Sequence, residues 1–147
     1  MNEIPSPSNG KPISIKVIRD DRGALMVGEF EREIPFSVKR FFIVYDVPGS
    51  SLRGIHAHKQ CHQFLICTRG SCTVLVDDGK TRVCYELNAG GLGVYMPPLT
   101  WGNQSNWSTD AMLLVFASHY YDPDDYVRDY DEFLLLVKGP SIRNGPC

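Results

Sequence analysis

Residues 53–70 read Arg-Gly-Ile-His-Ala-His-Lys-Gln-Cys-His-Gln-Phe-Leu-Ile-Cys-Thr-Arg-Gly, and the interpretation of the whole chain depends on them. Nowhere else do titratable side chains cluster among apolar residues typical of strands. His56 and His58 are two positions apart, and side chains two apart on a strand point to the same face. We therefore expect both imidazoles in one cavity, which would be the site of chemistry.

The spacing H-x-H-x4-Q-x6-G, which ends at Gly70, resembles the first motif of the cupin barrels. In that motif two histidines and a glutamate usually bind a metal. Gln63 stands where the glutamate is expected, and a neutral amide oxygen is a poorer ligand for a divalent cation than a carboxylate. The motif therefore predicts the cavity but not its metal.

The second cupin motif, P-x-G-x-x-H, resembles residues 97–102, where Gly102 occupies the position of the third histidine ligand. Replacement ligands could come from His62 or His119. However, His62 is adjacent to Gln63 and should point to the other face of its strand. We expect no bound metal and no other cofactor.

The bulk properties favour a single soluble domain. A chain of 147 residues can bury roughly 70% of its unfolded surface. A net charge of −2 without a basic run argues against nucleic-acid or anionic-membrane partners. The chain has no membrane-spanning apolar run and its N-terminus has no signal-peptide pattern, so we expect a cytoplasmic protein. Five cysteines without a C-x-x-C pair suit reduced, buried thiols.

Apolar runs separated by turn residues predict many short strands and one short helix, which together indicate an all-β cupin or jelly-roll barrel with a short C-terminal helical segment. Residues 40–47 are expected to form a central strand and 111–117 a core strand. Asp-Gly at 78–79 predicts a hairpin with a type I′ turn. The expected strands are 13–18, 24–30, 40–47, the one that carries His56 and His58, 72–76, 81–87, 94–98, 111–117 and 133–137.

The domain boundaries follow from composition. Residues 1–12 are expected to form a loose N-terminal tail, 13–140 the single cupin domain, and 141–147 a C-terminal tail. Asp122 followed by proline predicts a helical turn or two ending at Asp129. The acidic residues around it match no calcium loop, so solvated or capping roles are expected for Asp122, Asp124, Asp125, Asp129, Asp131 and Glu132.

A longer series of motifs is similar to one particular family, the sugar 3,4-ketoisomerases that act on dTDP-4-keto-6-deoxy-D-glucose. The resemblance extends over residues 15–135, and its Arg-Gly-x-His-Ala-His-Lys block is specific. The matching motifs, in order, are Asp21-Arg22-Gly23-x-Leu25, Ile34-Pro35-Phe36 with Lys39-Arg40, Arg53-Gly54-x-His56-Ala57-His58-Lys59, Gln63, Asp77-Asp78-Gly79, Pro97-Pro98-x-x-Trp101 and Tyr121-Asp122-x-x-Asp125-Tyr126-x-Arg128-Asp129-Tyr130.

This resemblance implies a metal-free cupin homodimer that moves a keto group from C4 to C3 of a nucleotide-linked sugar, on routes to 3-amino-3,6-dideoxy sugars of surface glycans or antibiotics. The shift needs a base at C3, an acid at C4 and no redox cofactor. Imidazole titrates near neutral pH and can serve in either form. We expect His58 as the main base, with His56 stabilising the enediolate or assisting the second transfer.

The remaining site residues are expected to bind substrate. Arg53 and Arg22 would neutralise the diphosphate or the oxyanion, and Gln63 would orient a histidine or a sugar hydroxyl. Tyr45 and Trp101 would wall the sugar or base pocket. For two of them a plainer interpretation is more common: Arg22 as a solvated turn residue and Tyr45 as a half-buried strand aromatic.

Two other functions stay open on the sequence. A metal-dependent cupin enzyme, either an oxygenase or a sugar isomerase, would carry near-stoichiometric metal. A non-catalytic sugar-nucleotide binding module would bind the ligand without exchanging its C3 hydrogen. The two histidines could also be satisfied polar core residues, although this is a weak explanation for an aligned pair beside Arg and Gln.

Overall fold

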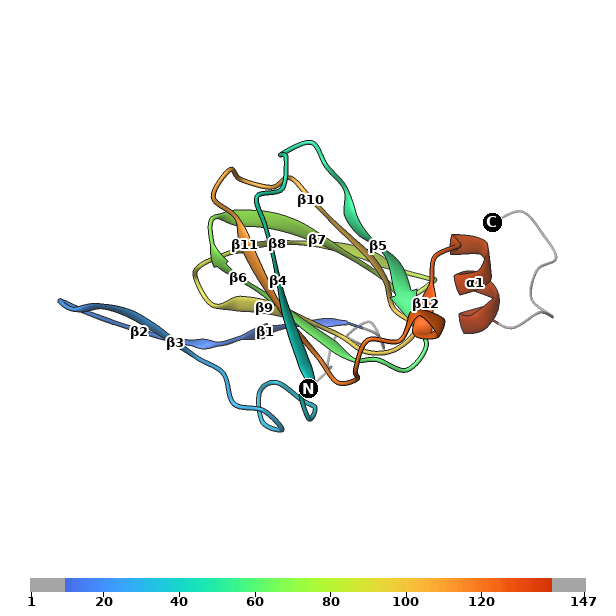
Figure 1. The fold of residues 1–147 in the computed structure, drawn as a ribbon, viewed down its shortest axis with the longest axis horizontal. Coiled ribbons are helices and arrows are strands. Elements are labelled where there is room, and N and C mark those ends of the chain that lie inside the picture. Colours follow the sequence, from blue (N-terminus) through green and yellow to red (C-terminus); the bar gives the residue numbers. More distant parts are fainter. Residues whose placement is uncertain (1–9, 139–147) are drawn as a thin grey trace, which may run out of the picture.

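A computed structural model describes residues 10–138, which form two antiparallel five-stranded sheets facing each other (Figure 1). The all-β cupin barrel expected from the sequence is confirmed. The first sheet has the order β1 (Lys11–Ser14), β9 (Leu92–Met96), β6 (Gln63–Arg69), β11 (Met112–Ala117), β4 (Arg40–Tyr45). The second has the order β12 (Tyr126–Val127), β5 (Arg53–His58), β10 (Trp101–Ser105), β7 (Ser71–Asp77), β8 (Arg82–Asn88).

The two sheets bury one apolar core between their inner faces, as the alternating side chains of the strands require. A second apolar cluster lies on the outer face of the first sheet, around Phe64 and Ile66. It is covered by the N-terminal segment, which includes Ile15, Ile34 and Phe36. Between this segment and the sheet a cavity of about 260 Å³ remains, lined by apolar residues that include Ile34 and Phe64.

A hairpin of β2 (Lys16–Asp20) and β3 (Gly23–Val27) extends away from the barrel on the side opposite the C-terminal helix (Figure 1). The sequence predicted one strand over 13–18, but the chain breaks at the buried Ile15 between β1 and β2. Strand β1 begins at Lys11, inside the segment expected to be a loose tail. Residues 1–9 and 139–147, and with them the predicted C-terminal tail, lie outside the described residues.

Strand β4 is an edge strand, so the prediction of a central strand over 40–47 was wrong. Its apolar residues include Phe41 and Ile43, which are exposed. The predicted core strand β11 lies inside the sheet, between β6 and β4, and alternate residues along it are buried. The predicted hairpin at 72–87 is confirmed, but its turn is not type I′. The loop between Asp77 and Arg82 has four residues, and among them only Gly79 has a positive φ.

The C-terminal segment differs most from the expectation. Residues 133–137 form part of helix α1 (Tyr130–Lys138) rather than a last strand. Asp129 directly precedes the helix, and its side chain accepts the backbone N–H of Glu132, an arrangement typical of an N-cap. Phe133 is buried against Trp101, while Leu135 and Leu136 face solvent. The apolar run thus has helical rather than strand periodicity.

Candidate active site

Strand β5 places the two histidines inside the barrel, as its alternation predicted. The ring centroids of His56 and His58 are 4.9 Å apart with the planes nearly perpendicular. Both rings line a small cavity of about 10 Å³, together with Gln63 and Gly102. His56 and Gln63 also line a larger cavity of about 190 Å³ at the mouth of the barrel. The pair therefore stands where a small molecule could reach it.

A carboxylate from the C-terminal segment holds His58. The 3₁₀ turn Pro123–Asp125 leads into β12, which pairs with β5 and brings Asp125 over the histidine. Asp125 Oδ2 lies 2.9 Å from His58 Nδ1, and Asp125 Oδ1 accepts the backbone N–H of Gln60 at 2.7 Å. A carboxylate only accepts, so Nδ1 of the neutral ring carries the hydrogen.

The other nitrogen of His58 is then a lone-pair acceptor. Within the described residues, the buried Nε2 has no hydrogen-bond partner. Burial is the largest influence on the ring and lowers its pKa, while the hydrogen bond and charge of Asp125 act in the opposite direction. The positive charges of Arg40 and Arg128 lower it further. His58 is therefore a neutral imidazole at neutral pH, with its basic nitrogen directed away from Asp125.

His56 is more strongly perturbed. Burial, followed by the charges of His58 and Arg128, lowers its pKa from 6.5 to about 4. The ring centroid of Tyr126 lies 4.9 Å from that of His56 and 4.5 Å from that of His58. Tyr126 thus packs against both imidazoles and fixes their relative orientation. His56 is a neutral group that can donate one hydrogen bond, rather than a cation.

Of the residues predicted to bind substrate, two lie beside the histidines. Arg53, at the start of β5, and Gln63, at the start of β6, both line the cavity at the barrel mouth. Gln63 is 8% exposed and Arg53 is exposed, so an amide lies deep in the site and a guanidinium at its entrance.

The other three predicted residues are not brought to this site. Trp101 precedes the cavity-lining Gly102, so alternation turns its ring to the outer face, where it packs under α1 against Phe133. Tyr45 is 58% exposed and likewise outside the lining of both cavities. Arg22, at the tip of the β2–β3 hairpin, pairs with Asp20 at 2.6 Å and is exposed. Within one chain, these three residues therefore lie apart from the histidine pair, and their roles in binding substrate stay predictions.

The expected cupin metal set cannot assemble here. A Cβ at Gly102 would lie 2.6 Å from Met96 Cε and 2.9 Å from the carbonyl oxygen of Leu75, so the space for a third histidine is filled. His62 points to the outer face, as predicted, with Nδ1 2.7 Å from the hydroxyl of Tyr95. Gln63 offers only an amide. These donors do not fit the metal of the cupin enzymes.

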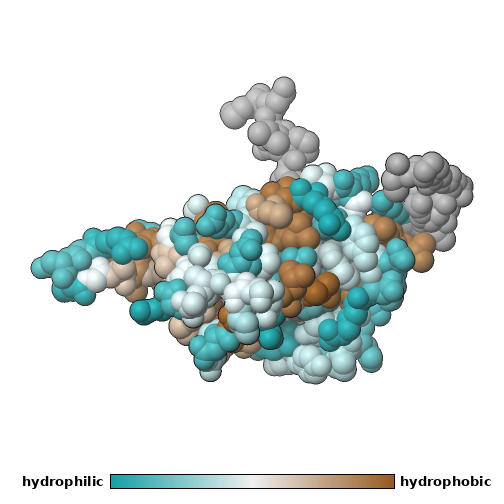
Figure 2. Space-filling model, turned by 90° about the horizontal axis from the view of Figure 1, so that it is seen from above, coloured by the Kyte–Doolittle hydropathy of each residue, from teal (hydrophilic) through white to brown (hydrophobic). Residues whose placement is uncertain are grey.

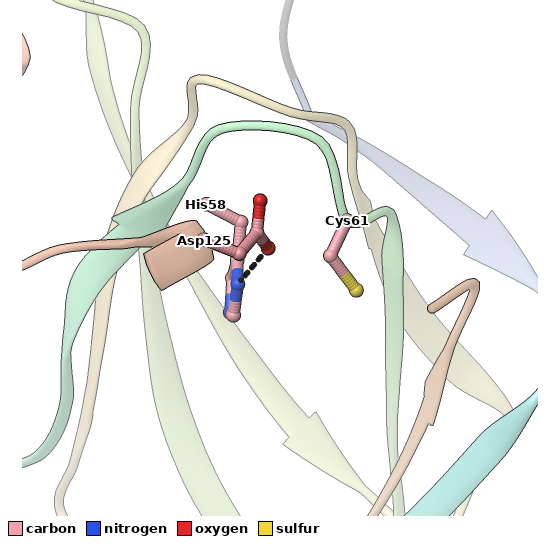
Figure 3. A group of neighbouring side chains, drawn as sticks. All are labelled: His58, Cys61 and Asp125. Carbon is pink, nitrogen blue, oxygen red and sulfur yellow. Dashed lines mark hydrogen bonds and ion pairs between the residues drawn. The ribbon is translucent and has the colours of Figure 1, made fainter. Parts of the chain in front are cut away.

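One different group of possible metal donors occurs in the described part of the chain: His58, Cys61 and Asp125 (Figure 3). Their donor atoms all lie within 4.8 Å of one another. Cys61 enters from the loop that follows β5, and it shares the small cavity with the histidines.

Three important residues were missed or misjudged on the sequence. Asp125 was grouped with solvated acidic residues, but its carboxylate pairs with His58. Tyr126 and Arg128 lie next to it, with the Arg128 guanidinium 4.5 Å from the Tyr126 ring. The signal that could have identified them is the Asp125-Tyr126-x-Arg128 motif, which belongs to the matching series. Only the pairing of β12 with β5 makes its position evident.

The two-sheet barrel with a histidine pair facing its interior is the architecture of a cupin. The chain belongs to the family described as FdtA: WxcM-like, C-terminal, whose sequence model matches residues 8–138. It is 42% identical over 127 residues to the TDP-4-oxo-6-deoxy-alpha-D-glucose-3,4-oxoisomerase of Aneurinibacillus thermoaerophilus, covering 86% of this chain and 91% of that protein. The chain is therefore a sugar-nucleotide 3,4-ketoisomerase.

Solved structures of 3,4-ketoisomerases are similar to this chain in both fold and sequence. A 3,4-ketoisomerase from Helicobacter canadensis is 39% identical with a TM-score of 0.82, covering 87% of this chain and 96% of that one. A TDP-quinovose 3,4-ketoisomerase from Campylobacter jejuni is 41% identical with a TM-score of 0.81, over 86% and 98%. A 3,4-ketoisomerase variant from Thermoanaerobacterium thermosaccharolyticum, solved with TDP-4-keto-6-deoxyglucose, is 35% identical with a TM-score of 0.86, over 92% and 98%.

Proposed function

We propose that this enzyme moves the keto group of dTDP-4-keto-6-deoxy-D-glucose from C4 to C3 through an enediol, with His58 as the base. The observation that carries the proposal is the arrangement of His58: Nδ1 is held by Asp125 and the buried Nε2 is free of partners within the described residues. Its relatives are 3,4-ketoisomerases or oxoisomerases of TDP-sugars. The product would serve the synthesis of 3-amino-3,6-dideoxy sugars.

The reaction needs two proton transfers between neighbouring carbons. His58 Nε2 takes the proton from C3, the C3–H electrons form a double bond to C4, and the C4 carbonyl oxygen becomes an enediolate oxygen. The proton on the C3 oxygen then passes to the C4 oxygen, the C3–O bond becomes the new carbonyl, and the electrons of the C3–C4 double bond take the imidazolium proton at C4. The net change moves two hydrogens and no electrons leave the sugar. Such proton transfer is typically worth about 10²–10⁴-fold in rate.

Each neighbouring side chain has a part in this scheme. Asp125 stabilises the imidazolium that forms on His58 and keeps Nε2 directed at the sugar. His56 donates a hydrogen bond to the enediolate oxygen, a role that suits a neutral ring with a pKa of about 4. Arg53, at the mouth, pairs with the diphosphate, and Gln63 orients a sugar hydroxyl.

The test is to incubate the purified protein with the 4-keto sugar nucleotide in D₂O and to follow it by NMR. The expected result is deuterium at C3 of the 4-keto substrate, deuterium at C4 of the 3-keto product and accumulation of that product, all unchanged by EDTA. Binding without exchange would indicate a non-catalytic module. Activity that EDTA abolishes would indicate a metal enzyme.

We further propose that the chain acts as a homodimer in the cytoplasm. Edge strand β4 exposes Phe41 and Ile43, and the projecting hairpin exposes Leu25. Figure 2 shows hydrophobic residues at the root of this hairpin, among hydrophilic ones. No helix in the described residues is long and apolar enough to cross a membrane. Light scattering should give twice the chain mass, and Ile43→Glu should shift it toward the monomer. A monomeric wild type would contradict the dimer.

A further inference from the structure

Three donor side chains from separate segments meet beside the histidine pair (Figure 3). His58 ends β5, Cys61 lies in the loop before β6, and Asp125 ends the 3₁₀ turn near the C-terminus. Their ligand atoms lie within 4.8 Å of one another, and His58 and Cys61 are buried. This set shares only His58 with the metal motif of the cupins, so it is a different site.

The donor types suit a thiophilic divalent cation. Zn²⁺ binds imidazole nitrogen at about 2.0–2.1 Å, thiolate sulfur at about 2.3 Å and carboxylate oxygen at about 2.0–2.2 Å, commonly with three protein ligands and one open position. Tetrahedral bonds of that length place ligand atoms about 3.6 Å apart. The His58–Asp125 pair, now at 2.9 Å, would open slightly, and Cys61 would approach by about 1 Å at most.

Cys61 is available for such a bond because its existing contacts are weak. Its thiol donates to the carbonyl of His62 at 3.3 Å and accepts from the hydroxyl of Ser118 at 3.9 Å. It forms no disulfide, and the proposed isomerisation does not use it. His58 and Cys61 line a cavity of about 10 Å³, which is close to the volume of one probe sphere for a water and enough for a bare cation. The Asp125 carboxylate reaches this group through His58 Nδ1, 2.9 Å away.

We propose that His58, Cys61 and Asp125 form an inhibitory Zn²⁺ site. The metal takes the thiolate of Cys61, the carboxylate of Asp125 and the Nδ1 lone pair of His58. The Cys61 thiol releases its proton to solvent, and the hydrogen formerly on Nδ1 moves to Nε2. With a hydrogen on Nε2, His58 cannot accept the C3 proton. The inhibitory effect rests on the proposed role of His58, whereas metal binding does not.

Cobalt(II) reports binding directly, because thiolate ligation gives a charge-transfer band in the near ultraviolet. Titrating the metal-stripped protein with Co²⁺ should give this band at one equivalent per chain, and Zn²⁺ should displace it. Cys61→Ser should remove the band, and Cys84→Ser, which removes an exposed thiol elsewhere, should keep it. No band in the wild type, or an equal band in the Cys61 variant, would overturn the site.

Inhibition is measured on the same proteins in metal-buffered assays. Zn²⁺ should inhibit the wild type reversibly, with EDTA restoring activity. Cys61→Ser, or Cys61→Ala if the serine variant does not fold, should remain active and need at least about 10-fold more Zn²⁺. Equal inhibition of these variants would overturn the proposal. Cobalt binding with full activity would instead contradict His58 as the base, which separates failure of the site from failure of the proposed mechanism.

Discussion

Replacing Asp125 by asparagine tests the arrangement that makes His58 a base. Asp125 Oδ1 accepts the backbone N–H of Gln60, which needs an acceptor, so the carbonyl of the new amide should keep that place. The amide NH₂ would then face His58 Nδ1. Two donors cannot face each other, and the ring would change to the tautomer with hydrogen on Nε2.

The size of the effect follows from two contributions. Losing a hydrogen bond to a charged partner costs about 1.5–3 kcal/mol, which corresponds to about 10- to 160-fold in rate once the imidazolium forms. The unfavourable tautomer adds to this loss, up to the full contribution of a general base, about 10²–10⁴-fold. We expect kcat for Asp125→Asn to fall at least about 10-fold, within this upper limit.

The pH profile gives a second readout. Asp125 raises the pKa of His58 against the larger effect of burial. Removing the carboxylate should lower that pKa further, so the acidic limb of kcat/KM should move to lower pH. Asp124→Asn, an exposed residue of the same turn, is the matched control and should leave both unchanged. Wild-type kcat and an unshifted profile in Asp125→Asn would refute the reasoning.

Three further predictions concern stability, measured by urea denaturation. His56 has a pKa of about 6.5 in the unfolded chain and about 4 in the folded one, so the free energy of unfolding should fall by up to about 3 kcal/mol as the pH drops through this window. This loss should disappear in His56→Gln, and an equal loss in the variant and the wild type would contradict the prediction. Gly102→Ala should cost about 1–3 kcal/mol, because its Cβ would crowd Met96 Cε and the Leu75 carbonyl; a neutral change would show that the space is not filled. Tyr130→Phe should cost about 1.5–3 kcal/mol, because the phenol donates to the buried Asp77 at 2.7 Å; full stability would mean that this bond does not anchor α1.

Local patterns in the sequence were sufficient for the barrel and for the histidine pair. Alternation predicted the shared face of His56 and His58 and the outward direction of His62, because strand geometry alone determines them. The Asp-Gly turn predicted the β7–β8 hairpin, although not its loop conformation. These features depend on residues close together in the chain.

The features that sequence patterns did not reveal depend on contacts between distant segments. Asp125 is 67 positions from His58, and only the pairing of β12 with β5 brings them together. β4 is exposed because no strand pairs with its outer side in the sheet, and the amino-acid composition of a strand does not determine whether it lies at an edge. Trp101 and Gly102 both follow Pro97-Pro98, a motif that suggested a pocket. Because side chains alternate along a strand, Gly102 lines the cavity and Trp101 points to the outer face. Residues 133–137 were read as a strand because Asp129-x-x-Glu132 was not recognised as a helix cap.

The most direct test of the account is C3 hydrogen exchange by the two histidine variants. With the 4-keto sugar nucleotide in D₂O, NMR follows loss of the C3 proton signal separately from product formation. We predict that His58→Gln shows no C3 exchange above the uncatalysed rate, while His56→Gln still exchanges C3, more slowly than wild type. Exchange at the wild-type rate in His58→Gln would contradict the assignment of His58 as the base.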